Sequence, residues 1–147
     1  MFKAEIKGLK ELQLKIERYD KDLSVRIDKE LSDGAENIAV MARSKAPKGR
    51  SGKLGASISA DVTRKFNKSI SVGVIYAPYV EFGTGVKVFQ NPSFNFTPEM
   101  RLYAREFYVT GKGKQPAHPF LFPSFVIEKK RIIDRIKQVL FGKGGKL

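Results

Sequence analysis

The sequence predicts an α+β fold in which helices cover a small, mainly antiparallel sheet. Residues 2–7 alternate apolar and charged side chains, which is the period of a half-buried strand. Residues 9–45 and 123–141 place apolar side chains at three- and four-residue steps, the period of amphipathic helices. Two short segments rich in Val and Ile lie between them and read as strands. This order of elements is typical of helices packed on one face of a sheet.

The first half of the chain is predicted to begin with a strand and a long N-terminal helix. Gly8 ends the strand, and the helical stripe continues over residues 9–45. It is either one helix or two, since Asp20 or Asp22 is able to cap a new start. Pro47 closes it, because the residue before a proline is pushed out of the α region.

A loop and a hairpin are predicted to follow. Residues 48–52 form a basic, glycine-rich loop, in which Ser51 is a candidate cap for a short helix at 54–58. Residues 59–64 and 69–75 read as two strands joined by a turn.

The second half begins with a short helix. Pro78 favours a helical turn, which Gly83 stops. Residues 86–115 then form an irregular arm rich in aromatic side chains. Within the arm we expect a strand at 86–89 and a short helix at 98–104.

The chain is predicted to end in a helix over residues 123–141 and a loose tail at 142–147. We see no internal repeat or linker, so residues 1–147 are interpreted as a single domain. The apolar face of the last helix is expected to hold Val126, Ile132, Ile133, Ile136, Val139 and Leu140.

Composition excludes several classes of protein. The 147 residues carry 28 Lys+Arg against 15 Asp+Glu, a net charge of +13, which favours a polyanionic neighbour such as nucleic acid or an acidic protein face. The absence of cysteine excludes disulfides and thiolate metal sites, and it fits a cytosolic origin. No signal peptide is visible, and no apolar run approaches the ~20 residues of a membrane span.

The sequence offers no convincing catalytic set, so no enzyme, cofactor or metal site is predicted. The loop containing Lys53 lacks the glycine spacing of a phosphate loop, and Leu54 stands where a Ser or Thr would be needed. His118 is the only histidine and is interpreted as structural. Glu81 is the most interesting carboxylate. Its structural interpretation, as an acceptor for the Gly-Thr-Gly turn that follows it, is preferred over a catalytic one.

Two basic regions and the aromatic arm are the candidate interaction surfaces, with subunits or DNA. The alternatives without a binding partner are that the basic helix face is only solvated, and that the aromatic side chains cover the protein's own sheet. DNA contact would be electrostatic and unspecific, because no base-reading motif is visible. The candidate residues are Lys48, Arg50 and Lys53 in the loop, Phe89, Phe94, Phe96, Tyr103 and Phe107 in the arm, and Lys129, Lys130 and Arg131 in the last helix.

Four segments in order resemble a family of tail-completion or neck proteins of long-tailed bacteriophages, similar in role to the minor tail protein Z of phage lambda. They are the Gly-Leu-x-x-Leu opening at 8–12, the Ser-Gly-Lys-Leu segment at 51–58, Tyr-Ala-Pro-Tyr-Val-Glu-Phe-Gly-Thr at 76–84 and Pro-Ala-His-Pro-Phe-Leu-Phe-Pro-Ser at 116–124. Ser51 and Ser124 depart from the Thr and Ala of the family pattern. The structural residues carried over from the last two segments are Tyr79, Glu81, Phe82, Gly83, Pro119, Phe120 and Pro123.

The resemblance implies a non-enzymatic virion protein at the head–tail junction. We therefore expect a homo-oligomeric ring with six-fold symmetry that completes the tail, assembled in the host cytoplasm. Its implied neighbours are a head-closure (stopper) protein, a tail terminator, and tail-tube or tape-measure proteins. DNA would pass through the channel, and no membrane is involved. The alternative from the residues alone is a small basic DNA-binding or packaging accessory protein.

Overall fold

The computed structural model describes residues 2–5, 21–89, 95–104 and 113–142. The elements run in the order β1 (Phe2–Glu5), α2 (Lys21–Lys45), α3 (Lys53–Ala56), β2 (Ile58–Asp61), β3 (Ser69–Val72), α4 (Ala77–Phe82), the 3-10 helix η1 (Gly85–Lys87), α5 (Pro98–Ala104) and α6 (Leu121–Phe141). The fold class is therefore α+β, as predicted.

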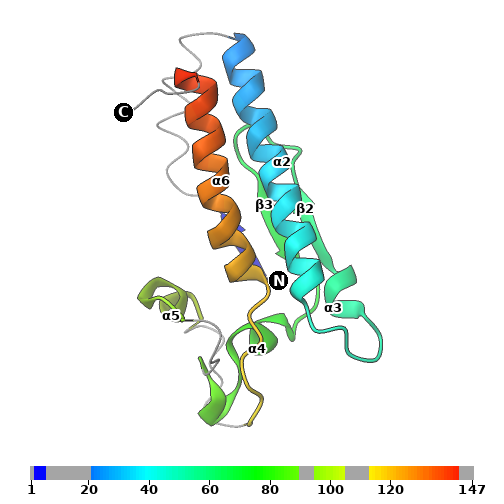
Figure 1. Cartoon of the computed structure of the whole chain (residues 1–147). Coiled ribbons are helices and arrows are strands. Elements are labelled where there is room, and N and C mark those ends of the chain that lie inside the picture. The colour runs from blue at the N-terminus through cyan, green and yellow to red at the C-terminus, as the bar shows by residue number, and fades with distance from the viewer. Residues whose placement is uncertain (1, 6–20, 90–94, 105–112, 143–147) are drawn as a thin grey trace.

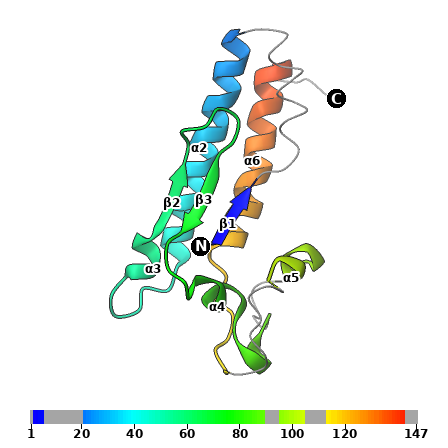
Figure 2. The same cartoon turned by 180° about the vertical axis from the view of Figure 1, so that it is seen from behind.

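Helices α2 and α6 lie side by side and antiparallel, and the sheet lies behind them (Figures 1 and 2). The sheet has three antiparallel strands in the order β1-β3-β2. The short elements α3, α4 and α5 gather at the lower end of the molecule in Figure 1, where α2 ends and α6 begins. This lower end holds the two motif segments at 76–84 and 116–124, which are rich in aromatic residues, Gly and Pro.

Helix α2 forms because its apolar stripe faces both the sheet and α6. The buried residues recur at helical steps, and the helix is unbroken from Lys21 to Lys45. It ends just before Pro47, as predicted. The question of a second helix before it concerns residues 6–20, which lie outside the described residues. The buried stripe is Ser24, Ile27, Leu31, Gly34, Ala35, Ile38, Ala39 and Ala42.

The predicted hairpin is confirmed, with shorter strands than expected. Ile58 pairs with Val72 and Asp61 with Ser69. An ion pair between the buried Lys68 and the partly buried Asp28 holds its loop to α2. Lys68 Nζ lies 2.9 Å from Asp28, and the backbone N–H of Phe66 donates to the same carboxylate at 2.6 Å. Lys68 also donates to two loop carbonyls, and these hydrogen bonds offset the cost of burying its ammonium group.

Three local predictions are wrong. The cap of α3 is Gly52, with a left-handed φ of 61° and no side-chain hydrogen bond, rather than Ser51. Residues 86–89 form no strand, because the chain turns through η1 with Gly85 at a φ of 54°. Helix α6 begins at Leu121, two residues before the predicted start at Pro123.

The predicted apolar face of α6 is also partly wrong. Ile132 and Ile136 are buried, but Val126 and Ile133 are 50% and 42% exposed. Ser124 and Glu128 are buried in their place. The helix is rotated so that two polar side chains face the interior, and each finds hydrogen-bond partners there, which removes the cost of burying them.

Candidate functional site

Glu81 joins the two motif segments at the lower end of the molecule. Its side chain is 1% exposed and accepts three backbone hydrogen bonds, all from the start of α6. Oε2 accepts from Phe120 N at 2.8 Å and from Leu121 N at 3.0 Å, and Oε1 accepts from Phe122 N at 2.9 Å. We call this arrangement, Glu81 with those three N–H groups, the Glu81 clasp. Glu81 was predicted as an acceptor, but its donors are these distant groups and not the adjacent Gly-Thr-Gly turn.

The clasp explains why the Phe-Leu-Phe-Pro sequence opens a helix. The first four N–H groups of any α-helix lack an intrahelical acceptor. In α6 three of them donate to Glu81, and the fourth position is Pro123, which has no N–H. Phe120 itself gives no side-chain cap. A carboxylate from another helix therefore does what a local Ser or Asp does at most helix starts, and it also lies favourably at the positive end of the helix dipole.

Backbone pairs reinforce the contact between the two segments. His118 N donates to Val80 O at 2.7 Å, and Thr84 N donates to Gln115 O at 2.9 Å. The Thr84 hydroxyl oxygen in turn accepts from Gln115 N at 2.9 Å. His118 thus contributes through its backbone, while its side chain is exposed.

Gly83 allows the close approach of the two segments. It ends α4 with a φ of 82°, a conformation that favours glycine. A Cβ at this position would lie 2.7 Å from Lys87 O and 2.9 Å from Ala117 N, closer than side chains and backbone approach in folded proteins. The Glu-Phe-Gly-Thr sequence therefore places the acceptor and the required glycine two residues apart.

Burial governs the protonation of the clasp. Desolvation raises the pKa of Glu81 to about 7, although the three backbone N–H groups and the charge of Lys45 act in the opposite direction. Neutral backbone dipoles satisfy both oxygens, but they supply no full positive charge to offset the loss of water. The carboxyl group therefore titrates near neutral pH.

Four phenylalanines form an aromatic cluster beside the clasp. The Phe82 ring lies 5.6 Å from that of Phe122, 6.1 Å from Phe89 and 6.3 Å from Phe96, measured between centroids. Phe89 and Phe96 are 5.1 Å apart, and Phe96 is only 6% exposed. Two of the arm residues singled out from the sequence are thus packed against α4 of the same chain. Phe94 and Phe107 lie outside the described residues, as does the side chain of Tyr103.

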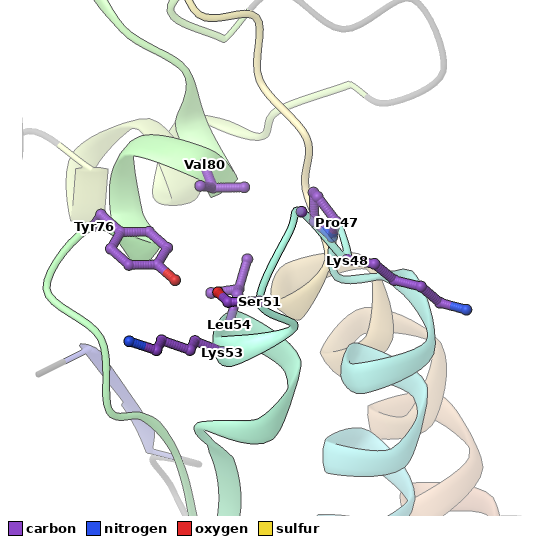
Figure 3. A pocket seen from close by; sticks show the side chains of 8 residues that line it. Pro47, Lys48, Ser51, Lys53, Leu54, Tyr76 and Val80 are labelled. Carbon is purple, nitrogen blue, oxygen red and sulfur yellow. The ribbon is translucent and has the colours of Figure 1, made fainter.

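The basic loop lines a shallow pocket of about 160 Å³ between α3 and α4. Figure 3 shows the Lys53 side chain extending beneath the ring of Tyr76, whereas the Lys48 ammonium group points away from the pocket. Arg50 does not line it. The three basic residues predicted as one cluster are therefore divided, with Lys53 alone directed to the pocket side.

The basic residues of α6 are likewise divided. Lys129, Lys130 and Arg131 are all exposed, but a guanidinium nitrogen of Arg131 lies 3.4 Å from Glu128. The outer surface of α6 also exposes Val126, Ile127, Ile133 and Phe141. It is a mixed cationic and apolar surface rather than a purely basic one.

Glu128 is the polar residue that the sequence analysis missed. It is 1% exposed and accepts from Arg135 at 2.8 Å and from Asn37 of α2 at 3.1 Å. Arg135 also pairs with Glu30 of α2 at 2.8 Å, so the network joins the two long helices. The sequence could have indicated that Glu128 is buried, because it lies at helical spacing from Leu121, Ser124 and Ile132, on the same face of the helix.

Two further features are absent from the residues that the structure describes. No group of three or more His, Asp or Glu side chains among them is arranged to hold a metal ion. Within the same residues, no helix is both long and apolar enough to cross a membrane.

One comparison identifies relatives of this chain. No curated protein and no solved structure matches it. The family model described as "Bacteriophage HK97-gp10, putative tail-component" matches residues 10–83, just over half of the chain, and its match ends at the glycine that follows Glu81 and Phe82. That range covers α2, the hairpin and α4, including the acceptor half of the clasp. The chain therefore belongs to the HK97-gp10-like family of bacteriophage tail components, which supports a structural role in the tail and a place in the virion.

Proposed function

We propose that the chain forms a homo-oligomeric ring at the head–tail junction, where it completes the tail and connects it to the head. The family match to tail components carries this proposal. Six-fold symmetry is the expected order. The proposed neighbours are a head-closure (stopper) protein on one side and a tail terminator, tail-tube or tape-measure protein on the other.

The shape of the subunit supports ring formation. A ring needs one surface of each subunit to fit a different surface of the next. In Figures 1 and 2, α5 lies on one flank of α4, and the basic loop with α3 lies on the other flank. The two flanks differ in composition, since α5 exposes Glu99, Arg101 and Leu102, whereas the charged side chains exposed by the loop are all basic. The buried residues of all the larger elements form one core cluster, which supports a single domain.

The net charge of +13 supports a position around DNA. Summed over the copies of a ring, this charge produces a strong field for phosphates without reading sequence. The proposed DNA contact is therefore transient and unspecific.

The clasp supports a structural rather than a catalytic role for Glu81. Both of its carboxylate oxygens are engaged by backbone donors in a buried position. A general base would instead need an oxygen within reach of a substrate. In the proposed function Glu81 holds α6 against α4, so that the subunit presents rigid surfaces to its neighbours.

A phage in which the gene for this chain is interrupted tests the proposal. We expect filled heads and separate tails by electron microscopy, and joined particles once the purified chain is added to the lysate. Immunogold labelling of wild-type particles should place the chain at the neck. Normal joined particles without the chain would contradict the proposal.

A small basic DNA-binding or packaging accessory protein is the second candidate, and the exposed Lys129 and Lys130 favour it. Binding of the isolated chain to DNA with a steep salt dependence, together with its absence from virions, would support that function. The apolar side chains exposed on α6 before and after these lysines, such as Ile127 and Ile133, favour a protein neighbour instead.

A further inference from the structure

The pocket beside the basic loop has the features of a receptor for one side chain. Its walls include Pro47, Leu54 and Val80, and the last two are almost completely buried. Its volume of about 160 Å³ is similar to that of apolar cavities that hold a benzene-sized group, about 150 Å³. An aliphatic side chain from outside therefore fits its size and its lining.

Tyr76 and Lys53 add an exposed aromatic ring and one cation to the pocket. Ile75, next to the lining residue Tyr76, is 86% exposed, and Tyr76 is itself 42% exposed. Lys53 extends beneath the ring of Tyr76 (Figure 3) and makes no ion pair with any residue that the structure describes. The preferred occupant is thus an aliphatic side chain with a carboxylate close to it.

Helix α5 carries such a pair on the other flank of the same end. Leu102 is 66% exposed, and Glu99 lies three residues before it, on the same helix face. The opposite face anchors α5 to the subunit, because Met100 is buried in the core cluster together with Phe96, which lies just before the helix. Glu99 makes no ion pair within the described part of the chain.

Comparable pairs also occur on α2: Val40 is 57% exposed and follows the exposed Glu36, and Val25 is 62% exposed and follows the exposed Asp22. Both pairs lie on the long helix rather than on the flank opposite the loop. A subunit placed head to tail beside its neighbour brings opposite flanks together. This geometry favours α5 as the occupant, and it makes Glu36 and Val40 a matched control.

We propose that Leu102 of one copy of this chain inserts into the pocket formed by Leu54, Tyr76 and Val80 of the next copy, with Glu99 paired to Lys53. This inference rests on the proposed ring and specifies one of its subunit contacts. The apolar anchor and the flanking ion pair are complementary in both shape and charge. The contact is heterologous, so it repeats around a ring.

Cross-linking in assembled tails tests this contact. The chain contains no cysteine, so a thiol reagent reacts only at introduced sites of this protein. Tails carrying the E99C/K53C variant are treated with a short bis-maleimide reagent and examined on a denaturing gel with an antibody against the chain. Leu102 stays in place in this variant. The control is E36C/K53C, and each single variant is a second control.

We expect E99C/K53C to give a ladder of covalent multimers, and the control variants to give none. Tails assembled from a mixture of E99C and K53C chains should give dimers only, because each chain carries a single cysteine. As an independent measurement, K53E should reduce tail joining about tenfold or more, because it places two negative charges opposite each other, and E99K in the same chain should restore it.

The outcomes separate the contact from the function. A chain that is present in tails, but gives neither the ladder nor the charge-swap rescue, overturns the contact and leaves the ring function standing. A ladder with E36C/K53C alone would assign the pocket to α2 and overturn the proposal. A wild-type chain that is absent from tails overturns the proposed function and this inference with it.

Discussion

Glu81 and Glu128 are equally buried, at 1% exposure each, but their carboxylates meet different partners. Glu81 accepts only backbone N–H groups, and burial raises its pKa to about 7. Burial acts on Glu128 as well, but hydrogen bonds from Arg135 and Asn37 and the charge of Arg135 hold its pKa below the ordinary value. Backbone dipoles satisfy a buried carboxylate without neutralising it, whereas a guanidinium does both. The lower end of the molecule is therefore expected to respond to pH near neutrality, and the helix pair is not.

The replacement Glu81→Ala should have the largest effect. It leaves three buried N–H groups without an acceptor, and each costs about 1–3 kcal/mol. We expect the free energy of unfolding to fall by at least about 3 kcal/mol in urea denaturation. Glu36→Ala removes an exposed carboxylate on α2 and should change it by less than about 0.5 kcal/mol. Equal effects of the two replacements would show that the clasp contributes little.

The pH dependence of stability should follow the raised pKa of Glu81. The folded protein keeps the proton up to about pH 7, whereas the unfolded chain loses it near 4.5. The stabilising contribution is therefore complete below pH 4.5 and is lost as pH rises to about 7, by at most about 3 kcal/mol. Unfolding free energies of wild type and Glu81→Gln, measured between pH 5 and 8, should differ in this slope. Parallel curves would contradict the raised pKa.

Gly83→Ala should destabilise the same end through the backbone. The left-handed φ costs about 1–3 kcal/mol for a residue with a side chain, and the new Cβ would meet backbone atoms of residues 87, 115 and 117. We expect a loss of about 2 kcal/mol or more in thermal or urea unfolding. Gly49→Ala is the matched control, because Gly49 has a similar positive φ but open space around it. A loss no larger than that of the control would indicate that the segments do not approach closely at Gly83.

Glu128→Gln should cost less than the loss of the clasp. Arg135 keeps its pair with Glu30, and glutamine keeps one acceptor oxygen for Asn37 or Arg135. A hydrogen bond to a charged group contributes about 1.5–3 kcal/mol, so we expect a loss near the lower figure. Arg131→Gln, which removes a largely exposed pair, should cost less than about 1 kcal/mol. A loss larger than that of Glu81→Ala would reverse the ranking of the two sites.

The sequence predicted most elements because their signals are local. The alternation at 2–5, the stripe of α2, the hairpin and the proline and glycine around α4 each act over a few residues. The start of α6 is different, since its cap is a carboxylate 39 to 41 residues away. No spacing rule connects a buried glutamate with backbone groups that far along the chain. The role of Glu81 as an acceptor was predictable, but its donors were not.

The buried face of α6 shows a second limit. Periodicity assigned Val126 and Ile133 to the interior because they are apolar, and the structure exposes both. The helix instead buries Ser124, which donates to Phe120 O, and Glu128, which meets Arg135 and Asn37. The burial of Glu128 could be predicted only once its partner on α2, Asn37, was known. The exposed apolar residues are free to contact another protein.

Amide hydrogen exchange at Phe120, Leu121 and Phe122 tests the Glu81 clasp most directly. If Glu81 holds the start of α6, these three amides exchange as slowly as those in the centre of the helix, and Glu81→Gln accelerates them more than it accelerates the amides near Glu128. Rapid exchange at all three positions in the wild-type protein would contradict the clasp. It would show that α6 begins without the support of α4.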